Sequence, residues 1–287
     1  MGAALSGAAG LATTAVLPMS RAVASPRSPA RLPPLNTTAL RAAIQDLEHP
    51  PSTGIPEPVT AEDVLRHRFD HWTPQEWVAT VTRLPLKFAP GTRQEYRGIH
   101  YVLAAMIIDE VTGRPYGEAV EARILRPLGL TRTVVPGNDP QVRGPHVHGY
   151  LALADGGLRD ITSYDQSSAR GEGDMISTAG DLDRMLSALF SGELLRPELL
   201  EPMFTLPPDH VRMLDGSPAR YSSGLQEATV NGVTLWGKTG ETYGYKNAAF
   251  STRDRQRRFV LAYNPTAARG SGESQMVARV AGLLTRS

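Results

Sequence analysis

The chain has 287 residues, of which 41% are hydrophobic and 21% charged, so it has enough apolar material to bury a core. Its formal net charge is +1 and its basic and acidic residues are interspersed, which argues against a nucleic acid or another polyanion as partner. The sequence contains no Cys, which excludes disulfides, thiolate metal sites and a Cys nucleophile. Together these features predict a globular fold.

The first 24 residues are typical of an export signal. Gly2–Pro18 is small and apolar, and Ala22-Val23-Ala24 matches an A-x-A cleavage site. The signal is incomplete because no Lys or Arg precedes Arg21, so an Ala-rich tail is the alternative. Export predicts a secreted or extracytoplasmic protein. The Pro-, Ser- and Arg-rich residues 25–36 are predicted to be a mobile leader, and residues 37–287 a single domain without a membrane span.

Helical signals dominate the chain up to about residue 204. Five helices are predicted from a capping or initiating residue followed by an apolar stripe, and they start near Asn36, Thr60, Thr73, Thr178 and Pro197. Apolar spacing and a closing Gly predict two more helices, over Tyr101–Val111 and Val120–Leu128. The Gly-, Pro- and Asp-rich stretch 134–169 predicts long loops with one short strand at Tyr150–Leu153.

After residue 224 the apolar period changes to two, which indicates strands. Leu225–Val230 and Val233–Trp236 flank Asn231-Gly232, a pair that predicts a hairpin with a type I′ turn. A second hairpin is predicted to pair Ala248–Ser251 with Phe259–Tyr263. The last predicted helix, Glu273–Leu284, would cover the sheet with Val277, Val280 and Leu283. The predicted fold class is α+β, a helical lobe followed by an antiparallel sheet flanked by helices.

Lys238-Thr239-Gly240, set between apolar strands, is the candidate substrate-binding wall. Lys238 would supply a positive charge for a substrate carboxylate, Thr239 a hydroxyl for the same group, and Gly240 room for a ligand backbone beside the strand. Ordinary turn chemistry before an exposed loop is the alternative interpretation of the same three residues.

Five stretches together carry a family resemblance. They are Phe88–Tyr101, Ile107–Gly113, Pro127–Thr131, Met175–Leu182 and Gly237–Gly240. In order and approximate spacing they resemble the penicillin-recognising serine hydrolases, and more narrowly the secreted D-alanyl-D-alanine carboxypeptidases of actinobacteria and the related class C β-lactamases and esterases. The resemblance implies a β-lactamase/DD-peptidase-like fold, no cofactor, and a peptidoglycan stem peptide or a β-lactam-like small molecule as partner.

The resemblance also implies an acyl-enzyme mechanism whose first part is missing from this sequence. In the family a Ser in Ser-x-x-Lys attacks the acyl carbonyl, and the Lys one turn later takes its proton. This chain contains three Lys (Lys87, Lys238 and Lys246), and none follows a Ser by three residues. Ser-x-x-Arg occurs at Ser28, Ser167 and Ser217, but a guanidinium that stays protonated cannot act as the base. No nucleophile is found.

The family's Tyr-x-Asn motif is half present. Tyr96 matches the Tyr that implies a proton relay, with packing against the following helix as the alternative, while Gly98 stands where the Asn would orient the substrate. Glu241 follows the triplet and is expected to weaken carboxylate binding by about 1 kcal/mol or more unless it turns to solvent.

The space between the first predicted helix and Val59-Thr60 is short compared with relatives. Only His49–Pro58 fills the place of two N-terminal strands and the nucleophile helix, which suggests an internal deletion. Phe259–Tyr263 would then become an exposed sheet edge, through which the protein could associate.

The sequence gives only weak signals for a metal site or for another type of hydrolase. His146-Val147-His148 could bind a metal, but two His without a third ligand are more often loop chemistry, so no metal is predicted. A Gly-x-Ser-x-Gly elbow is absent, and Asp70-His71 with Ser52 does not make a triad by proximity in sequence.

Three functions therefore remain open. The first is a serine hydrolase-like protein that is catalytically impaired. The second is a non-catalytic module that binds cell-wall peptides or a protein. The third is hydrolysis by another Ser or by an activated water.

Overall fold

The computed structural model describes residues 60–82, 85–265 and 274–286, all of which belong to one compact unit, residues 34–287. The predicted export signal, leader, first helix and deletion site lie outside the described residues. In the described part, no helix is both long and apolar enough to cross a membrane.

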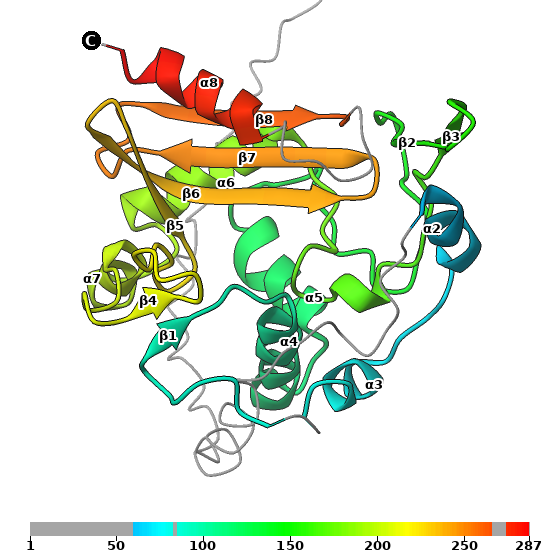
Figure 1. Cartoon of the computed structure of the whole chain (residues 1–287), viewed down its shortest axis with the longest axis horizontal. Helices are drawn as coiled ribbons and strands as arrows, with labels where there is room; N and C mark the ends of the chain where they lie inside the picture. The colour runs from blue at the N-terminus through cyan, green and yellow to red at the C-terminus, as the bar shows by residue number, and fades with distance from the viewer. Residues whose placement is uncertain (1–59, 83–84, 266–273, 287) are drawn as a thin grey trace, which may run out of the picture. The chain divides into compact units, whose positions relative to one another are not determined.

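The centre of the fold is a four-stranded antiparallel sheet (Figure 1). Its strands follow chain order: β5 (Gln226–Val230), β6 (Val233–Thr242), β7 (Tyr245–Ser251) and β8 (Arg258–Tyr263). The predicted hairpin turn is confirmed, because Asn231 and Gly232 have φ angles of 49° and 76°, both positive as a type I′ turn requires. The predicted pairing of the last two strands is also confirmed. Among the described strands, β8 lies at one edge of the sheet.

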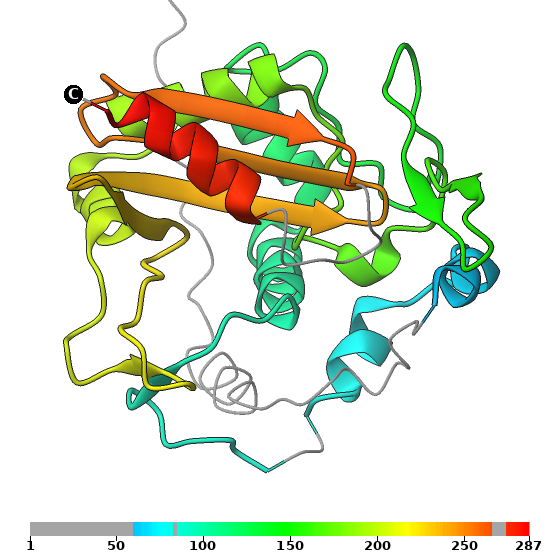
Figure 2. The same cartoon turned by 45° about the horizontal axis from the view of Figure 1, so that its top comes forward.

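One helix covers each face of this sheet (Figure 2). On one face α8 (Ser274–Leu284) packs Ala281 into a cluster with Leu235, Phe250 and Phe259. On the other face α6 (Ala179–Ser191) packs Leu186, Leu189 and Phe190 against Trp236. The Thr178 side chain accepts a hydrogen bond from the Asp181 amide and begins α6, as the sequence predicted.

The prediction that Leu283 faces the sheet is wrong. Its side chain is 65% exposed, whereas Ala281 is 4% exposed and Val277 and Leu284 pack against the sheet cluster. Positions 277, 281 and 284 recur at i, i+4 and i+7 and share one face of the helix, and position 283 falls outside that stripe.

Helices and short strands make up the rest of the described chain. The helices are α2 (Ala61–His67), α3 (Pro74–Ala79), α4 (Ile99–Thr112), α5 (Tyr116–Val120), which continues into a π-helical turn at Glu121–Leu125, and α7 (Pro197–Leu200), with 3-10 turns at Ser167–Ala169 and Glu201–Phe204. The short strands are β1 (Arg93–Gln94), parallel to β4 (Arg212–Met213), and β2 (Tyr150–Ala152), antiparallel to β3 (Leu158–Asp160). The β3 strand was not predicted.

The start of α4 is anchored by packing, and this matters for the site. Ile99 and Val102 on α4 share a buried cluster with Trp77 from α3 and with Val81. Thr73 and Glu76 form the predicted capping box and fix the start of α3. The first turn of α4 is therefore held in place by its packing against α3.

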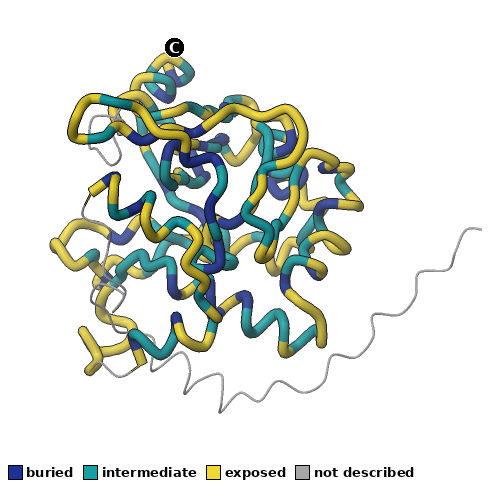
Figure 3. The backbone as a smooth tube through the Cα atoms, turned by 90° about the vertical axis from the view of Figure 1, so that its right-hand side faces the viewer, coloured by how far each residue is buried: buried dark blue, intermediate teal, exposed yellow. Residues whose placement is uncertain are grey.

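Buried residues lie in the interior of the fold, and most loops are exposed or half-buried (Figure 3).

Candidate active site

The candidate substrate-binding residues Lys238-Thr239-Gly240 lie within a strand and not in a loop that follows a strand. β6 continues through Lys238-Thr239-Gly240 to Thr242, whereas its pairing with β5 ends at Gly237. Beyond that point, among the described strands, β6 pairs with β7 alone. One edge of the Lys238–Thr242 stretch therefore has no strand partner in the described part of the chain, and extended peptides join sheets at such edges.

Side chains on β6 alternate between the two faces of the sheet. Lys238 and Gly240 lie on the face that carries Trp236 and α6, and Thr239 and Glu241 lie on the face that carries α8. A ligand group that meets both Lys238 and Thr239 must therefore sit at the open edge of the strand.

Glu241 is turned away from Lys238 and has its own partner. Its carboxylate lies 3.0 Å from the ammonium of Lys246, which stands directly opposite on β7. The pair lies on the α8 face, so the negative charge of Glu241 does not stand beside the face that carries Lys238.

Lys238 and Tyr96, both predicted site residues, come together. The Lys238 ammonium lies 4.4 Å from the centroid of the Tyr96 ring, a cation–π contact, and donates a hydrogen bond of 2.7 Å to the Thr239 carbonyl. The Tyr96 ring stacks on the Tyr221 ring, with 5.3 Å between the ring centroids, and its centroid lies 5.9 Å from that of the Tyr101 ring. Burial raises the pKa of Tyr96, so its hydroxyl stays protonated at neutral pH.

Polar contacts hold the segment around Tyr96 in place. The Gln94 side chain donates to the Tyr221 carbonyl at 2.8 Å and accepts from the Tyr221 amide at 3.0 Å. Glu95 pairs with Lys87 at 2.8 Å and with Arg97 at 2.7 Å. The two residues that flank Tyr96 are thus occupied with each other, which leaves the ring to face Lys238.

Glu172 lies beside the candidate site and was not predicted from the sequence. A Cβ atom on Gly98 would lie 2.0 Å from the Glu172 carboxyl carbon, so this carboxylate fills the space of a side chain at position 98. Glu172 is open to solvent on one side, yet desolvation by the surrounding protein raises its pKa, and the charge of Lys238 opposes that rise. The Gly at the family's Asn position was the available signal, but the partner that uses the space is distant in sequence.

The loop that carries Glu172 is fixed on both sides. Arg170 pairs with Asp109 of α4 at 2.5 Å, and the Tyr116 hydroxyl donates to the buried Asp174 carboxylate. Gly171 has φ +71°, and a Cβ there would lie 2.7 Å from the Tyr101 carbonyl oxygen, so the backbone packs directly on α4. These contacts hold Glu172 at the first turn of that helix.

Gly240 has a neighbour that was also missed. A Cβ on Gly240 would lie 2.6 Å from the side-chain nitrogen of Asn247, which stands opposite it on β7. The exposed Asn247 carboxamide therefore covers the strand where Gly240 leaves space, and it offers a donor and an acceptor on the Lys238 face.

The Ser-x-x-Arg pairs in the described residues have structural roles. The Ser167 hydroxyl accepts a hydrogen bond of 2.8 Å from the Trp72 amide, and Arg170 is paired with Asp109. Arg220, three residues after Ser217, pairs with Glu227 at 2.6 Å. The third pair, at Ser28, lies outside the described residues.

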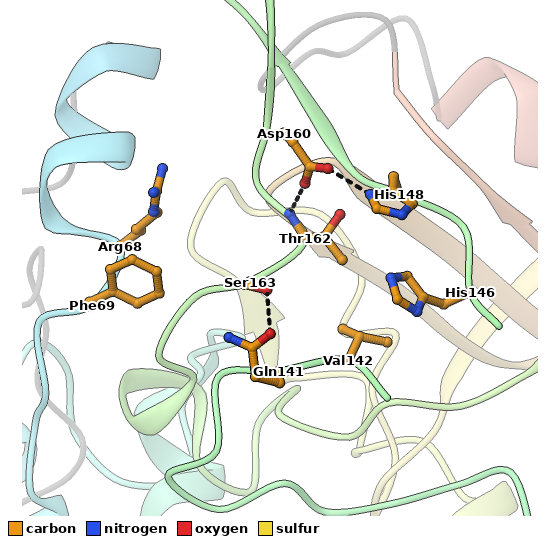
Figure 4. A pocket seen from close by; sticks show the side chains of 9 residues that line it. All are labelled: Arg68, Phe69, Gln141, Val142, His146, His148, Asp160, Thr162 and Ser163. Carbon is orange, nitrogen blue, oxygen red and sulfur yellow. Dashed lines mark hydrogen bonds and ion pairs between the residues drawn. The ribbon is translucent and has the colours of Figure 1, made fainter. Parts of the chain in front are cut away.

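A hollow of about 370 Å³ is lined by none of the residues around Lys238 and Tyr96 (Figure 4). It is lined by Arg68, Phe69, Gln141, Val142, His146, His148, Asp160, Thr162 and Ser163. His148 pairs with Asp160 at 2.6 Å, and hydrogen bonds from Thr162 and this His148 contact lower the pKa of Asp160 to about 2. His146 bonds the Gly144 carbonyl instead. Among the residues described, no group of three or more His, Cys, Asp or Glu is placed to hold a metal ion.

The Asp70-His71 pair does not form a catalytic dyad. Asp70 pairs with His67 at 2.8 Å, and His71 pairs with Asp165 at 3.0 Å. Ser52 lies outside the described residues.

A known protein family matches most of this chain. The β-lactamase family model matches residues 50–280. The chain belongs to this family. The match confirms the predicted resemblance and assigns the chain to a family of serine hydrolases with a β-lactamase/DD-peptidase fold.

Individual known proteins also align with much of the chain. A D-aminopeptidase from Gluconobacter oxydans is 25% identical over 205 residues, which are 69% of this chain and 36% of that protein. The structure of a D-stereospecific amidohydrolase from Streptomyces sp. is 34% identical with a TM-score of 0.66, and the match covers 75% of this chain and 63% of that one. The D-amino acid amidase of Ochrobactrum anthropi SV3, complexed with L-phenylalanine amide, is 30% identical with a TM-score of 0.62, over 73% and 63%. The chain thus spans less than two thirds of the length of each of these relatives.

Proposed function

We propose that this member of the β-lactamase family binds the ends of short D-amino-acid peptides or amides reversibly and does not form an acyl-enzyme. Two observations together carry the proposal. The sequence has no Ser-x-x-Lys, so the family's nucleophile and base are missing, whereas Lys238 and Tyr96 still meet at the open edge of β6.

The geometry supports binding of an extended ligand with a carboxylate. The free edge beside Lys238–Thr242 can hydrogen-bond a peptide backbone, and the Lys238 ammonium can pair with an anionic group. The relatives' names point to D-amino-acid peptides and amides as the ligand class. Peptidoglycan stem peptides end in such residues and lie outside the cytoplasm, which agrees with the export signal expected in residues 1–24.

A fluorescent penicillin and a D-Ala-D-Ala peptide test the proposal together. We expect no fluorescent adduct after denaturing electrophoresis, together with reversible peptide binding in titration calorimetry. Lys238→Ala should weaken peptide binding about tenfold or more, since it removes a charged hydrogen-bond donor. Arg159→Ala, which removes an exposed cation on β3, is the matched control and should bind normally.

An adduct that survives denaturation would overturn the proposal. It would show that another Ser of this chain acts as the nucleophile. Steady release of D-Ala without an adduct would instead indicate hydrolysis by an activated water.

A further inference from the structure

We propose that Glu172 forms an ammonium-binding subsite beside Lys238, so that the preferred ligand is a short D-peptide or D-amino-acid derivative with a free amino group. This inference rests on the proposed function, since it names the ligand class of the same site. It goes further because Lys238 and Thr239 alone predict affinity for a ligand carboxylate and predict no preference for a ligand amino group.

The placement of the Glu172 carboxylate is the first argument. It stands against Gly98 at the start of α4, within 2.1 Å of where a Cβ atom on that residue would be. The family's Tyr-x-Asn pattern would direct an amide side chain from this position toward the substrate. Here the space beside Tyr96 is filled by a carboxylate from a different loop.

The exchange reverses the hydrogen-bonding character of the subsite. An Asn amide offers both a donor and an acceptor, whereas an ionised carboxylate only accepts. A ligand carbonyl oxygen that faces Glu172 would meet a negative charge without a donor. A ligand ammonium there would gain charge-assisted hydrogen bonds.

The surroundings of Glu172 also suit a cation. The Glu172 carboxylate packs against Gly98, which lies between Tyr96 and Tyr101 in the sequence, and the Tyr221 ring stacks on the Tyr96 ring. Aromatic faces attract ammonium groups, and the Tyr96 ring already holds the Lys238 ammonium at 4.4 Å. Within the described residues, the Glu172 side chain accepts no hydrogen bond, so its oxygens can serve a ligand.

Lys238 and Glu172 together match a ligand with two opposite charges. A ligand carboxylate can pair with the ammonium of Lys238 while the ligand's amino group pairs with the carboxylate of Glu172, so the charges on the ligand complement those of the protein. The loop that carries Glu172 needs little rearrangement when a ligand binds, because the contacts of Arg170 and Asp174 hold it on either side of Glu172. The arrangement is thus complementary to a short peptide with both ends free.

Calorimetric titration with D-Ala-D-Ala and with N-acetyl-D-Ala-D-Ala tests the subsite in the full chain. We expect the wild-type protein to bind the free peptide about 10- to 100-fold more tightly than the acetylated one, the range for a hydrogen bond to a charged group. Glu172→Gln should lose this preference and still bind the acetylated peptide. Glu193→Gln, at an exposed glutamate after α6, is the matched control and should keep the preference.

The wild-type comparison is decisive even if a variant folds poorly. Equal affinity of the wild-type protein for the two peptides would overturn the subsite and leave the proposed function intact. Binding of neither peptide would overturn both. A preference that persists in folded Glu172→Gln, checked by circular dichroism, would also reject Glu172 as its source.

Discussion

The ammonium of Lys238 lies 4.4 Å from the centre of the Tyr96 ring, so the strand that supplies the positive charge is tied to the segment before α4. The family resemblance implies that the hydroxyl of this Tyr relays a proton. In this chain the Tyr96 ring also positions the Lys238 ammonium. The hydroxyl and the ring of Tyr96 can therefore have separate roles.

Two substitutions at Tyr96 distinguish those roles. Tyr96→Phe keeps the ring, so we expect peptide affinity within about twofold of the wild-type value. Tyr96→Ala removes the cation–π contact, worth about 0.5–2 kcal/mol, and should weaken peptide binding by roughly 2- to 30-fold. Titration calorimetry measures both. Loss of affinity in the Phe variant would show that the hydroxyl, and not the ring, holds the ligand.

Peptide affinity should begin to fall at a less acidic pH than an ordinary glutamate would predict. Burial raises the pKa of Glu172 above its ordinary value of 4.5, and an ammonium ligand needs the ionised carboxylate. Affinity for the free peptide should therefore fall as pH drops through a value above 4.5. In Glu172→Gln this fall should disappear, leaving the loss set by the ligand carboxylate at about pH 3.5.

The alkaline limb should depend on the ligand. Burial lowers the pKa of Lys238 below 10.5, and deprotonation removes the charge that binds a carboxylate. N-acetyl-D-Ala-D-Ala should lose affinity as pH rises through the pKa of Lys238. The free peptide should lose its advantage earlier, near pH 8, where its own amino group is deprotonated. Identical alkaline limbs for the two peptides would contradict the subsite.

Glycine 171 provides a test of how the Glu172 loop is held. Gly171→Ala places a side chain at φ +71° and 2.7 Å from the Tyr101 carbonyl oxygen, so we expect a loss of about 2 kcal/mol or more in the free energy of unfolding. The same change at Gly173 meets open space at an ordinary φ angle and should stay within about 0.5 kcal/mol. Urea denaturation of the two variants gives the comparison. Equal stability would show that the loop is not packed on α4 as described.

Local signals in the sequence predicted the elements whose causes are local. The Thr73 and Glu76 capping box, the Asn231-Gly232 turn and the Gly192 end of α6 each depend on residues a few positions apart, and the structure has all three. The extension of β6 to Thr242 was missed because it depends on pairing with β7, which periodicity within one strand does not reveal.

The site was predictable only where one segment supplies it. Lys238 and Tyr96 were found from their motifs, but their contact required the fold. Glu172 could not be found this way, because its place beside the candidate site follows from the missing side chain at Gly98, whose space a different part of the chain fills. Such exchanges between segments leave no periodic pattern in either segment.

The face of α8 offers a final prediction, because the sequence stripe and the structure disagree about it. Ala281 is 4% exposed and lies against Leu235 and Phe250, so Ala281→Glu would bury a charge without a partner and should cost several kcal/mol or prevent folding. Leu283 is 65% exposed, and Leu283→Glu should change the free energy of unfolding by no more than about 0.5 kcal/mol. Thermal denaturation of the pair distinguishes the two faces. A large loss in the Leu283 variant would mean that this side chain is covered in solution, for instance by a partner on the outer face of α8.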